Sequence, residues 1–304
     1  MARVNTPTPR ILQSRRACFI YLEFCRIHMD GDRLVYSMAQ GAVTREWNIP
    51  TANTAALLLG SGCSLTQAAA RKLAAERVLV AFTGGGGTPI FLGAVNEYAP
   101  TESLIQWIRF WPSADARLAV AKYFTHARCD AIDRIWPTYP SSPAPDVVTP
   151  FFRGRAETAR TIEQLRGFEG DFAKSAYKEV ARATGLQWRG RQAGEEEQDL
   201  ANAFLDQGNY LAYGAAGTVL WALGIPPGLA VNHGATRAGG LVFDLADTIK
   251  DAIILPIAFE CAARGDHSSE FRTRVIDTFD ELDVLPNLFG IMQEAIRQGG
   301  GAAA

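Results

Sequence analysis

The chain has few of the residues that disulfide frameworks and cysteine metal sites require. Its five cysteines, at positions 18, 25, 63, 129 and 261, are scattered over 304 residues and form no CxxC pair. This spacing argues against a cysteine zinc site and fits a reducing compartment. The amino terminus also lacks the apolar stretch of a secretory signal, so we expect a cytoplasmic protein.

The sequence also lacks a membrane-length apolar run and an excess of one charge. The longest uncharged run, residues 207–236, is interrupted by Pro226 and Pro227. The apolar part before these prolines is shorter than the ~20 residues that a spanning helix needs, so we expect a buried helix at 209–225 and no membrane association. The formal net charge of −2 excludes a global basic signature for nucleic acid and leaves only local basic patches.

The hydrophobic patterns that are present divide the chain into two parts. Residues 17–40 contain two β-rich runs joined by an Asp-Gly-Asp turn at 30–32, which predicts a hairpin. Beyond residue 100, apolar residues recur at the three- and four-residue spacing of helices. We therefore expect an α+β fold: an N-terminal β-sheet domain over 1–97, a larger all-α C-terminal domain over 98–298, and a disordered tail at 299–304.

Two shorter signals concern the β domain. Ser64 and Gln67 have the spacing of a capping box, which predicts that a helix starts there. Four consecutive glycines at 84–87 lack the lysine and hydroxyl residue of a phosphate-binding loop. We interpret them as a tight hairpin, with a loop whose backbone approaches a phosphate or a partner subunit as the alternative.

The segment HGATRAGGLVFDLADTIKD, residues 233–251, carries acids inside an apolar run. Asp244 and Asp247 share one helical face, and burying carboxylates is costly unless a cation meets them. His233 precedes them, and Glu169 lies upstream on a basic, amphipathic helix. One glutamate, one histidine and one aspartate would give the mixed oxygen and nitrogen ligation that suits Mg²⁺ or Mn²⁺.

Each of these residues also fits a purely structural role. A histidine before a glycine can serve in a loop, an aspartate pair near a helix start can face the positive end of the dipole, and Glu169 can be a solvated helix acid. Residues 153–191 contain nine Lys/Arg against five Asp/Glu, which favours a polyanionic substrate. Arg237 and Lys250 are our candidates for contacts with its phosphates.

The order of these motifs resembles that of CRISPR-associated protein one, the integrase that inserts new spacers into CRISPR arrays. The matching motifs, in the family's order, are Glu169-Gly170, Asn209-Tyr210, His233-Gly234 and Phe243-Asp244 with Asp247. Residues 47–93 resemble the type I-F (Ypest) branch of the family in particular. The resemblance therefore covers most of the chain.

The resemblance implies a metal-dependent DNA endonuclease and integrase in which Glu169, His233 and Asp247 hold Mg²⁺ or Mn²⁺. Asp244 falls on a further acidic position of the catalytic site. The resemblance also implies a homodimer formed through the β domain, binding of double-stranded and branched DNA, and a complex with CRISPR-associated protein two, which in this branch is fused to the helicase-nuclease protein three. Two alternatives remain: a non-catalytic DNA-binding scaffold of the same fold, and a helical metalloenzyme acting on small phosphorylated substrates.

Overall fold

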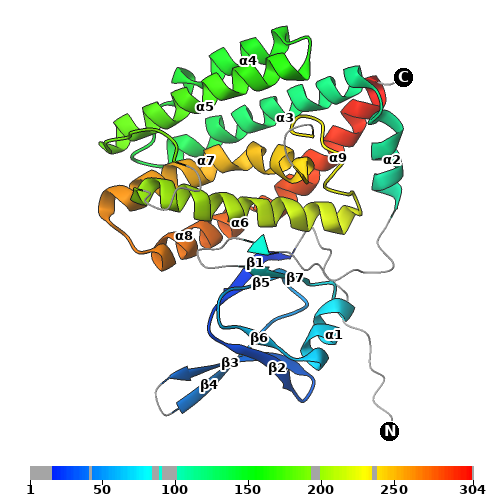
Figure 1. Cartoon of the computed structure of the whole chain (residues 1–304), viewed down its shortest axis with the longest axis vertical. Coiled ribbons are helices and arrows are strands. Elements are labelled where there is room, and N and C mark those ends of the chain that lie inside the picture. The colour runs from blue at the N-terminus through cyan, green and yellow to red at the C-terminus, as the bar shows by residue number, and fades with distance from the viewer. Residues whose placement is uncertain are drawn as a thin grey trace. The chain divides into compact units, whose positions relative to one another are not determined.

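The protein folds into a strand-rich part followed by a helical part. A computed structural model describes residues 16–40, 43–83, 89–90, 101–192, 199–234 and 238–302. The chain divides into two compact units, one built mainly from strands and α1, the other from helices α2 to α9 (Figure 1). This arrangement confirms the expected α+β class. The expected boundary at residues 97 and 98 lies outside the described residues.

The N-terminal unit contains two four-stranded sheets. The first has the order β1 (Ala17–Leu22), β5 (Thr54–Leu59), β7 (Leu79–Thr83) and β8 (Pro89–Ile90), with β5 parallel to both β1 and β7. The second has the order β4 (Val43–Asn48), β3 (Arg33–Gln40), β2 (Arg26–Asp30) and β6 (Ser64–Leu65). The antiparallel β2–β3 pair is the hairpin that the turn at residues 30–32 predicts.

The core of this unit forms around β5, all of whose residues are buried. A continuous apolar run of this kind is typical of a strand covered on both faces. Helix α1 (Gln67–Ala75) contributes Ala69 and Leu73 to the apolar cluster that contains Leu57. The helix and the sheets therefore share one core.

The start of α1 differs from the sequence-based expectation. Its N-cap is Thr66, whose hydroxyl accepts a hydrogen bond from the backbone N–H of Ala69 at 3.3 Å. Ser64 instead lies in β6, where it pairs with Arg26 of β2. The predicted cap at Ser64 is therefore wrong, because pairing with β2 keeps this residue extended.

The C-terminal unit is built around α7 (Gly240–Arg264), in which residues 251–261 are all buried. A largely apolar helix that is buried all round belongs at the centre of a bundle. Helices α3, α5, α6 and α8 pack around it (Figure 1). The bounds of the other helices are α2 (Glu102–Phe110), α3 (Ala114–Ile135), α4 (Thr149–Thr158), α5 (Ile162–Thr184), α6 (Leu200–Leu223), α8 (Ser268–Glu281) and α9 (Val284–Ala302), with short 3₁₀ turns at Trp136–Thr138 and Pro145–Val147.

Helix α6 covers most of the range 209–225, where the sequence predicts a buried helix, and it packs along α7. It ends at Gly224, whose φ of 70° lies in the left-handed region that favours glycine. Pro226 and Pro227 then prevent its continuation. Within the described ranges, no helix is long and apolar enough to cross a membrane.

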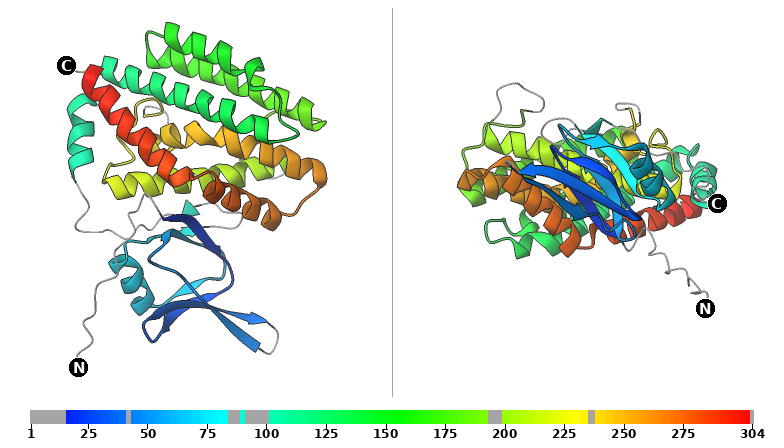
Figure 2. Two further views of the ribbon diagram at one scale, coloured as in Figure 1. Left: turned by 180° about the vertical axis from the view of Figure 1, so that it is seen from behind. Right: turned by 90° about the horizontal axis from the view of Figure 1, so that it is seen from below.

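The expected disordered tail is wrong for residues 299–302, because α9 continues through Ala302. Seen from behind, α9 is the red helix in Figure 2, and it packs against α2 and α3. Gly299 is buried against the ring of Phe110, where a Cβ atom would come within 2.6 Å. This packing stabilises a glycine-rich helix end that helix propensity alone does not favour. Residues 303–304 lie outside the described part.

Close packing of α6 on α7 can be tested at Gly208. A Cβ atom there would lie 2.3 Å from Cγ2 of Ile254. We expect Gly208→Ala to lower the free energy of unfolding by ~1–3 kcal/mol through overpacking. In the control Gly167→Ala on α5, the new Cβ meets nothing within 4 Å, so stability should rise by ~0.5–1 kcal/mol. Urea denaturation measures both changes, and equal effects would contradict the close contact.

Candidate metal centre

The loop between α6 and α7, which carries His233, is held by two tryptophans from another part of the unit. The indole Nε1 of Trp107 donates a hydrogen bond to the carbonyl of Leu229 at 3.0 Å. The indole Nε1 of Trp111 donates to the carbonyl of Ala230 at 2.8 Å. These bonds satisfy backbone groups that a buried loop would otherwise leave unpaired.

The glycine pair at the start of α7 brings the helix close to this loop. Gly239 has a φ of 70°, which lets the chain turn into the helix. A Cβ atom on Gly240 would lie 2.9 Å from the carbonyl carbon of His233 and 2.8 Å from Cβ of Ala230. A side chain at position 240 would therefore push the histidine loop away from α7.

Asp244 organises the loop from the first turns of α7. Its Oδ2 accepts hydrogen bonds from the backbone N–H of Val231 at 2.8 Å and of Asn232 at 3.0 Å. Its Oδ1 accepts the backbone N–H of His233 at 3.0 Å and lies 2.7 Å from Nδ1 of the same residue. The side chain is 0% exposed, and these four contacts compensate for its burial. Both oxygens of Asp244 are therefore engaged in holding the loop.

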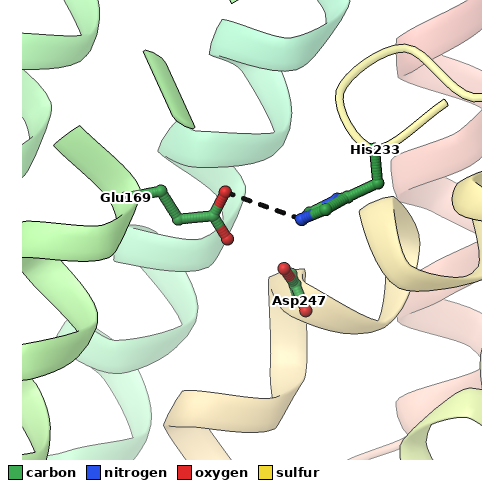
Figure 3. Close-up of side chains that lie close together, drawn as sticks. All are labelled: Glu169, His233 and Asp247. Carbon is green, nitrogen blue, oxygen red and sulfur yellow. Dashed lines mark ion pairs between the residues drawn. The ribbon is translucent and has the colours of Figure 1, made fainter. Parts of the chain in front are cut away.

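This contact also determines which ring nitrogen of His233 could bind a metal ion. In a neutral imidazole, Nδ1–H donating to Asp244 leaves the lone pair on Nε2. Nε2 faces Glu169 and lies 3.9 Å from its Oε2 (Figure 3). A carboxylate that orients a histidine in this way is a common partner of metal-binding imidazoles.

Glu169, His233 and Asp247 converge from α5, the loop and α7 (Figure 3). One potential ligand atom of each lies within 4.8 Å of those of the other two. Their side chains are 16%, 13% and 10% exposed, so the cluster is shielded but can still be reached from solvent. A single ion could contact all three side chains.

Two basic side chains offset part of the negative charge. Nη1 of Arg128, on α3, lies 2.8 Å from Oε1 of Glu169 and 3.9 Å from Oδ2 of Asp247. Nζ of Lys250 lies 2.5 Å from Oδ1 of Asp247. The remaining Arg128 nitrogens pair with Asp251, one turn further along α7.

Burial and charge shift the two carboxyl pKa values in opposite directions. Burial and then the charge of Asp247 raise the pKa of Glu169 above its ordinary value. Burial opposes ionisation of Asp247 as well, but Lys250 and Arg128 hold the pKa of Asp247 well below its usual range. Without a metal, the pair therefore retains a proton on Glu169 more readily than on Asp247, as expected for two adjacent carboxylates. A divalent cation would compete with that proton.

The donor set fits a hard divalent cation. Two carboxylates and an imidazole nitrogen are suited to Mg²⁺ or Mn²⁺ bound together with waters. Asn232 supports this fit, because its Nδ2 donates to Oε2 of Glu169 at 3.0 Å. Its buried Oδ1 accepts no hydrogen bond from any described residue, and can accept one from a water at the site. Glu169, His233 and Asp247 could thus hold the ion.

The structure brings together Glu169, His233 and Asp247, and it places Asp244 and Lys250 in contact with them. Asp244 lies beside them but turns its carboxylate to the histidine loop. The side chain of Lys250 is 16% exposed and paired with Asp247, so a phosphate contact would have to occur within the site. Arg237 lies outside the described residues, as do the four glycines at 84–87.

Sequence analysis missed Arg128, Asp251 and Asn232. Asp251 follows Asp247 by four residues, so its place on the same helical stripe was available as a signal. Asn232 directly precedes His233 and could have been considered with it. Arg128 has no comparable signal, because only the packing of α3 against α5 and α7 brings it to the site.

Several solved structures have a fold similar to that of this chain. A TtCas1–DNA complex matches with a TM-score of 0.72 at 24% identity, covering 92% of this chain and 91% of that one. A casposase bound to integration product matches with a TM-score of 0.66 at 16% identity, covering 81% of this chain and 73% of that one. A chain of a partial Cas6-RT-Cas1–Cas2 complex matches with a TM-score of 0.59 at 14% identity, covering 93% of this chain and 95% of that one. At these identities the likeness establishes the fold.

The relatives place the chain among the CRISPR-associated endonucleases. The enzyme of this name, Cas1, from Pseudomonas aeruginosa UCBPP-PA14 is 42% identical over 95% of both chains. That from Pectobacterium atrosepticum is 40% identical over 93% of both. A family model described as CRISPR associated protein Cas1 matches residues 19–276, and the chain belongs to this family.

The hydrogen bond between Asp244 and His233 can be tested in the metal-free protein through the pKa of the imidazole. Burial lowers the pKa of His233, but Asp244, Asp247 and Glu169 outweigh it and raise this pKa above 6.5. The protonated imidazole therefore stabilises the folded state, and this contribution to the free energy of unfolding is complete below pH 6.5 and is lost as the pH rises through the raised pKa. We expect Asp244→Asn to lower the pKa of His233, measured by NMR titration of the imidazole. An unchanged pKa would show that Asp244 does not control the ring.

Proposed function

We propose that this protein is a metal-dependent DNA endonuclease and integrase that inserts new spacers into CRISPR arrays by transesterification. Membership of the Cas1 family provides the class of activity. The observation that carries the finer proposal is the convergence of Glu169, His233 and Asp247 on one position. Lys250, which pairs with Asp247 beside them, is the basic side chain that a phosphate entering the site could contact.

In the proposed reaction, the 3′-hydroxyl oxygen of a captured DNA fragment bonds to the phosphorus of a phosphodiester at the border of a repeat. The attacking hydroxyl gives up its proton to water, the bond between that phosphorus and the 3′-oxygen of the array strand breaks, and the released oxygen takes a proton from water to become a new 3′-hydroxyl. A bound Mg²⁺ or Mn²⁺ supplies a Lewis acid that polarises the phosphoryl oxygen and stabilises charge on the reacting oxygens. No covalent intermediate with the protein is required.

Each side chain of the site has a distinct part in this proposal. Glu169, His233 and Asp247 would hold the ion, and Asp244 orients the imidazole. With Nδ1 engaged by Asp244 and Nε2 turned towards the ion, His233 would not act as the base for the attacking hydroxyl. Lys250, beside Asp247, would contact a phosphate that enters the site, and Arg237 remains our second candidate for such a contact.

The partners follow from the same proposal. Residues 98–298 would form the catalytic domain, and residues 1–97 would form a homodimer through an isologous interface. Double-stranded and branched DNA would be the substrates, and CRISPR-associated protein two, fused to the helicase-nuclease protein three, would complete the complex. Similar folds in a Cas1–DNA complex and in a complex that contains Cas1 and Cas2 support these assignments.

Two other functions predict different results for purified protein with branched DNA and Mn²⁺. A non-catalytic scaffold of the same fold would bind this DNA without cleaving or joining it. A metalloenzyme for small phosphorylated substrates would not bind it. The presence of all three potential metal ligands favours catalysis over the scaffold.

Alanine at Glu169, His233 or Asp247 should abolish strand cleavage and joining. The loss should exceed the ~10–100-fold that is typical when a residue only orients a metal ligand. DNA affinity should remain near that of the wild type and fall steeply with salt, because basic residues supply most of it. Strand-transfer assays and fluorescence anisotropy measure the two properties. The control is Glu163→Ala, an exposed acid earlier on α5, and activity retained in a ligand variant would remove that residue from the set.

The two aspartates of α7 should differ in a graded way. Asp247→Asn should remove almost all activity, because it changes a direct ligand. Asp244→Asn keeps one of the two acceptor oxygens but loses the charge, and it should leave a measurable remainder, with a loss of ~10–100-fold. Manganese titration of each variant, combined with strand-transfer rates, tests this order. If Asp244→Asn loses metal binding while Asp247→Asn retains it, the two roles are reversed.

A further inference from the structure

Arg128 makes more contacts than charge neutralisation of the metal site requires. It lies on α3 with its side chain 5% exposed, and its Nε donates a hydrogen bond to Oδ2 of Asp251 at 2.5 Å. Its Nη2 pairs with the same carboxylate. Its Nη1 instead donates to Oε1 of Glu169 at 2.8 Å. One guanidinium therefore joins α3, α5 and α7.

Aromatic rings fix the plane of this guanidinium. Its central carbon lies 4.9 Å from the ring centroid of Phe172 on α5 and 5.9 Å from that of Phe152 on α4. The two rings stack on each other at 4.2 Å. The indole Nε1 of Trp136 also donates to the backbone carbonyl of Asp251 at 3.0 Å, which holds the partner of Arg128 in place. The position of Arg128 is thus set by packing as well as by charge.

This arrangement decides which oxygen Glu169 can offer to an ion. Oε1 is taken by Arg128, whereas Oε2 is the oxygen that faces Nε2 of His233. Asn232 donates to the same Oε2. If Arg128 were absent, the glutamate could rotate, and Oε1 would lie in a buried place without a partner.

We infer that Arg128, held by Asp251, is a positioning residue that orients Glu169 for metal binding. This inference rests on the proposed function, because it concerns the same site. Lysine cannot replace Arg128, because an ammonium group lacks the planar fork that reaches Asp251 with two nitrogens and Glu169 with a third. A purely structural ion pair would require only Arg128 and Asp251.

The experiment measures Mn²⁺ affinity of the full chain by the electron paramagnetic resonance signal of the free ion. We expect Arg128→Lys to weaken this affinity roughly 10–100-fold. The double variant Arg128→Met/Asp251→Leu removes both charges, so neither is left buried without a partner. It should still fold and unfold cooperatively, with a midpoint lowered only by the loss of the contact to Glu169, yet bind Mn²⁺ as weakly as Arg128→Lys.

The matched control removes a different ion pair from the same helix. Glu260, on α7, pairs with Arg274 of α8 and has no contact with the three ligands among the described residues. The variant Arg274→Met/Glu260→Leu should bind Mn²⁺ within about twofold of the wild type, because it leaves Glu169 in place. A comparable loss in this control would mean that general loosening of α7 explains the effect.

The outcomes separate this inference from the proposed function. Folded Arg128→Met/Asp251→Leu that binds Mn²⁺ like the wild type would overturn the positioning role. If that variant does not fold, Asp251→Asn, which keeps hydrogen bonding to Arg128 but loosens it, should still weaken Mn²⁺ binding, and unchanged affinity would equally overturn the role. If instead the wild type and His233→Ala bind Mn²⁺ equally weakly, the proposed metal site itself fails.

Discussion

The helical unit depends on the compensation of four carboxylates that lie together out of water. Such groups are costly to bury unless hydrogen bonds or opposite charges meet them. Each carboxylate is compensated by different groups. Asp244 accepts backbone N–H groups, Asp251 pairs with Arg128, Asp247 pairs with Lys250, and Glu169 contacts Arg128 and Asn232. Four carboxylates against two permanent cations leave an excess of negative charge, which a divalent ion would balance.

The apolar character of α7 allows this cluster to be held in one arrangement. Because residues 251–261 of the helix are buried on all sides, neighbouring helices fix its rotation and position. The same packing brings Arg128 of α3 and Glu169 of α5 to the polar stripe of α7. The histidine loop is tied to the helix by the contact at Gly240 and by Asp244. Ligands from three chain segments thus share one rigid support, which precise metal sites require.

Local patterns in the sequence were sufficient for the fold class, the hairpin and the buried helix α6. They marked Glu169, His233 and the pair Asp244 and Asp247 as possible metal ligands, whereas only the resemblance to the family assigned the ligand role to Asp247 rather than Asp244. They failed where distant packing decides. Pairing with β2 keeps Ser64 in a strand, and contact with Phe110 keeps Gly299 in a helix. Likewise, nothing near Arg128 in the sequence reveals its contacts with α5 and α7.

Anomalous diffraction from crystals of the full chain soaked with MnCl₂ tests the central claim most directly, because it locates the ion without relying on activity. The account predicts a manganese peak bonded to Oε2 of Glu169, Nε2 of His233 and the carboxylate of Asp247. Asp244 should still accept Nδ1–H of the imidazole, and Arg128 should remain on Oε1 of Glu169. A peak elsewhere, or an imidazole turned so that Nδ1 meets the ion and Asp244 is released, would contradict it.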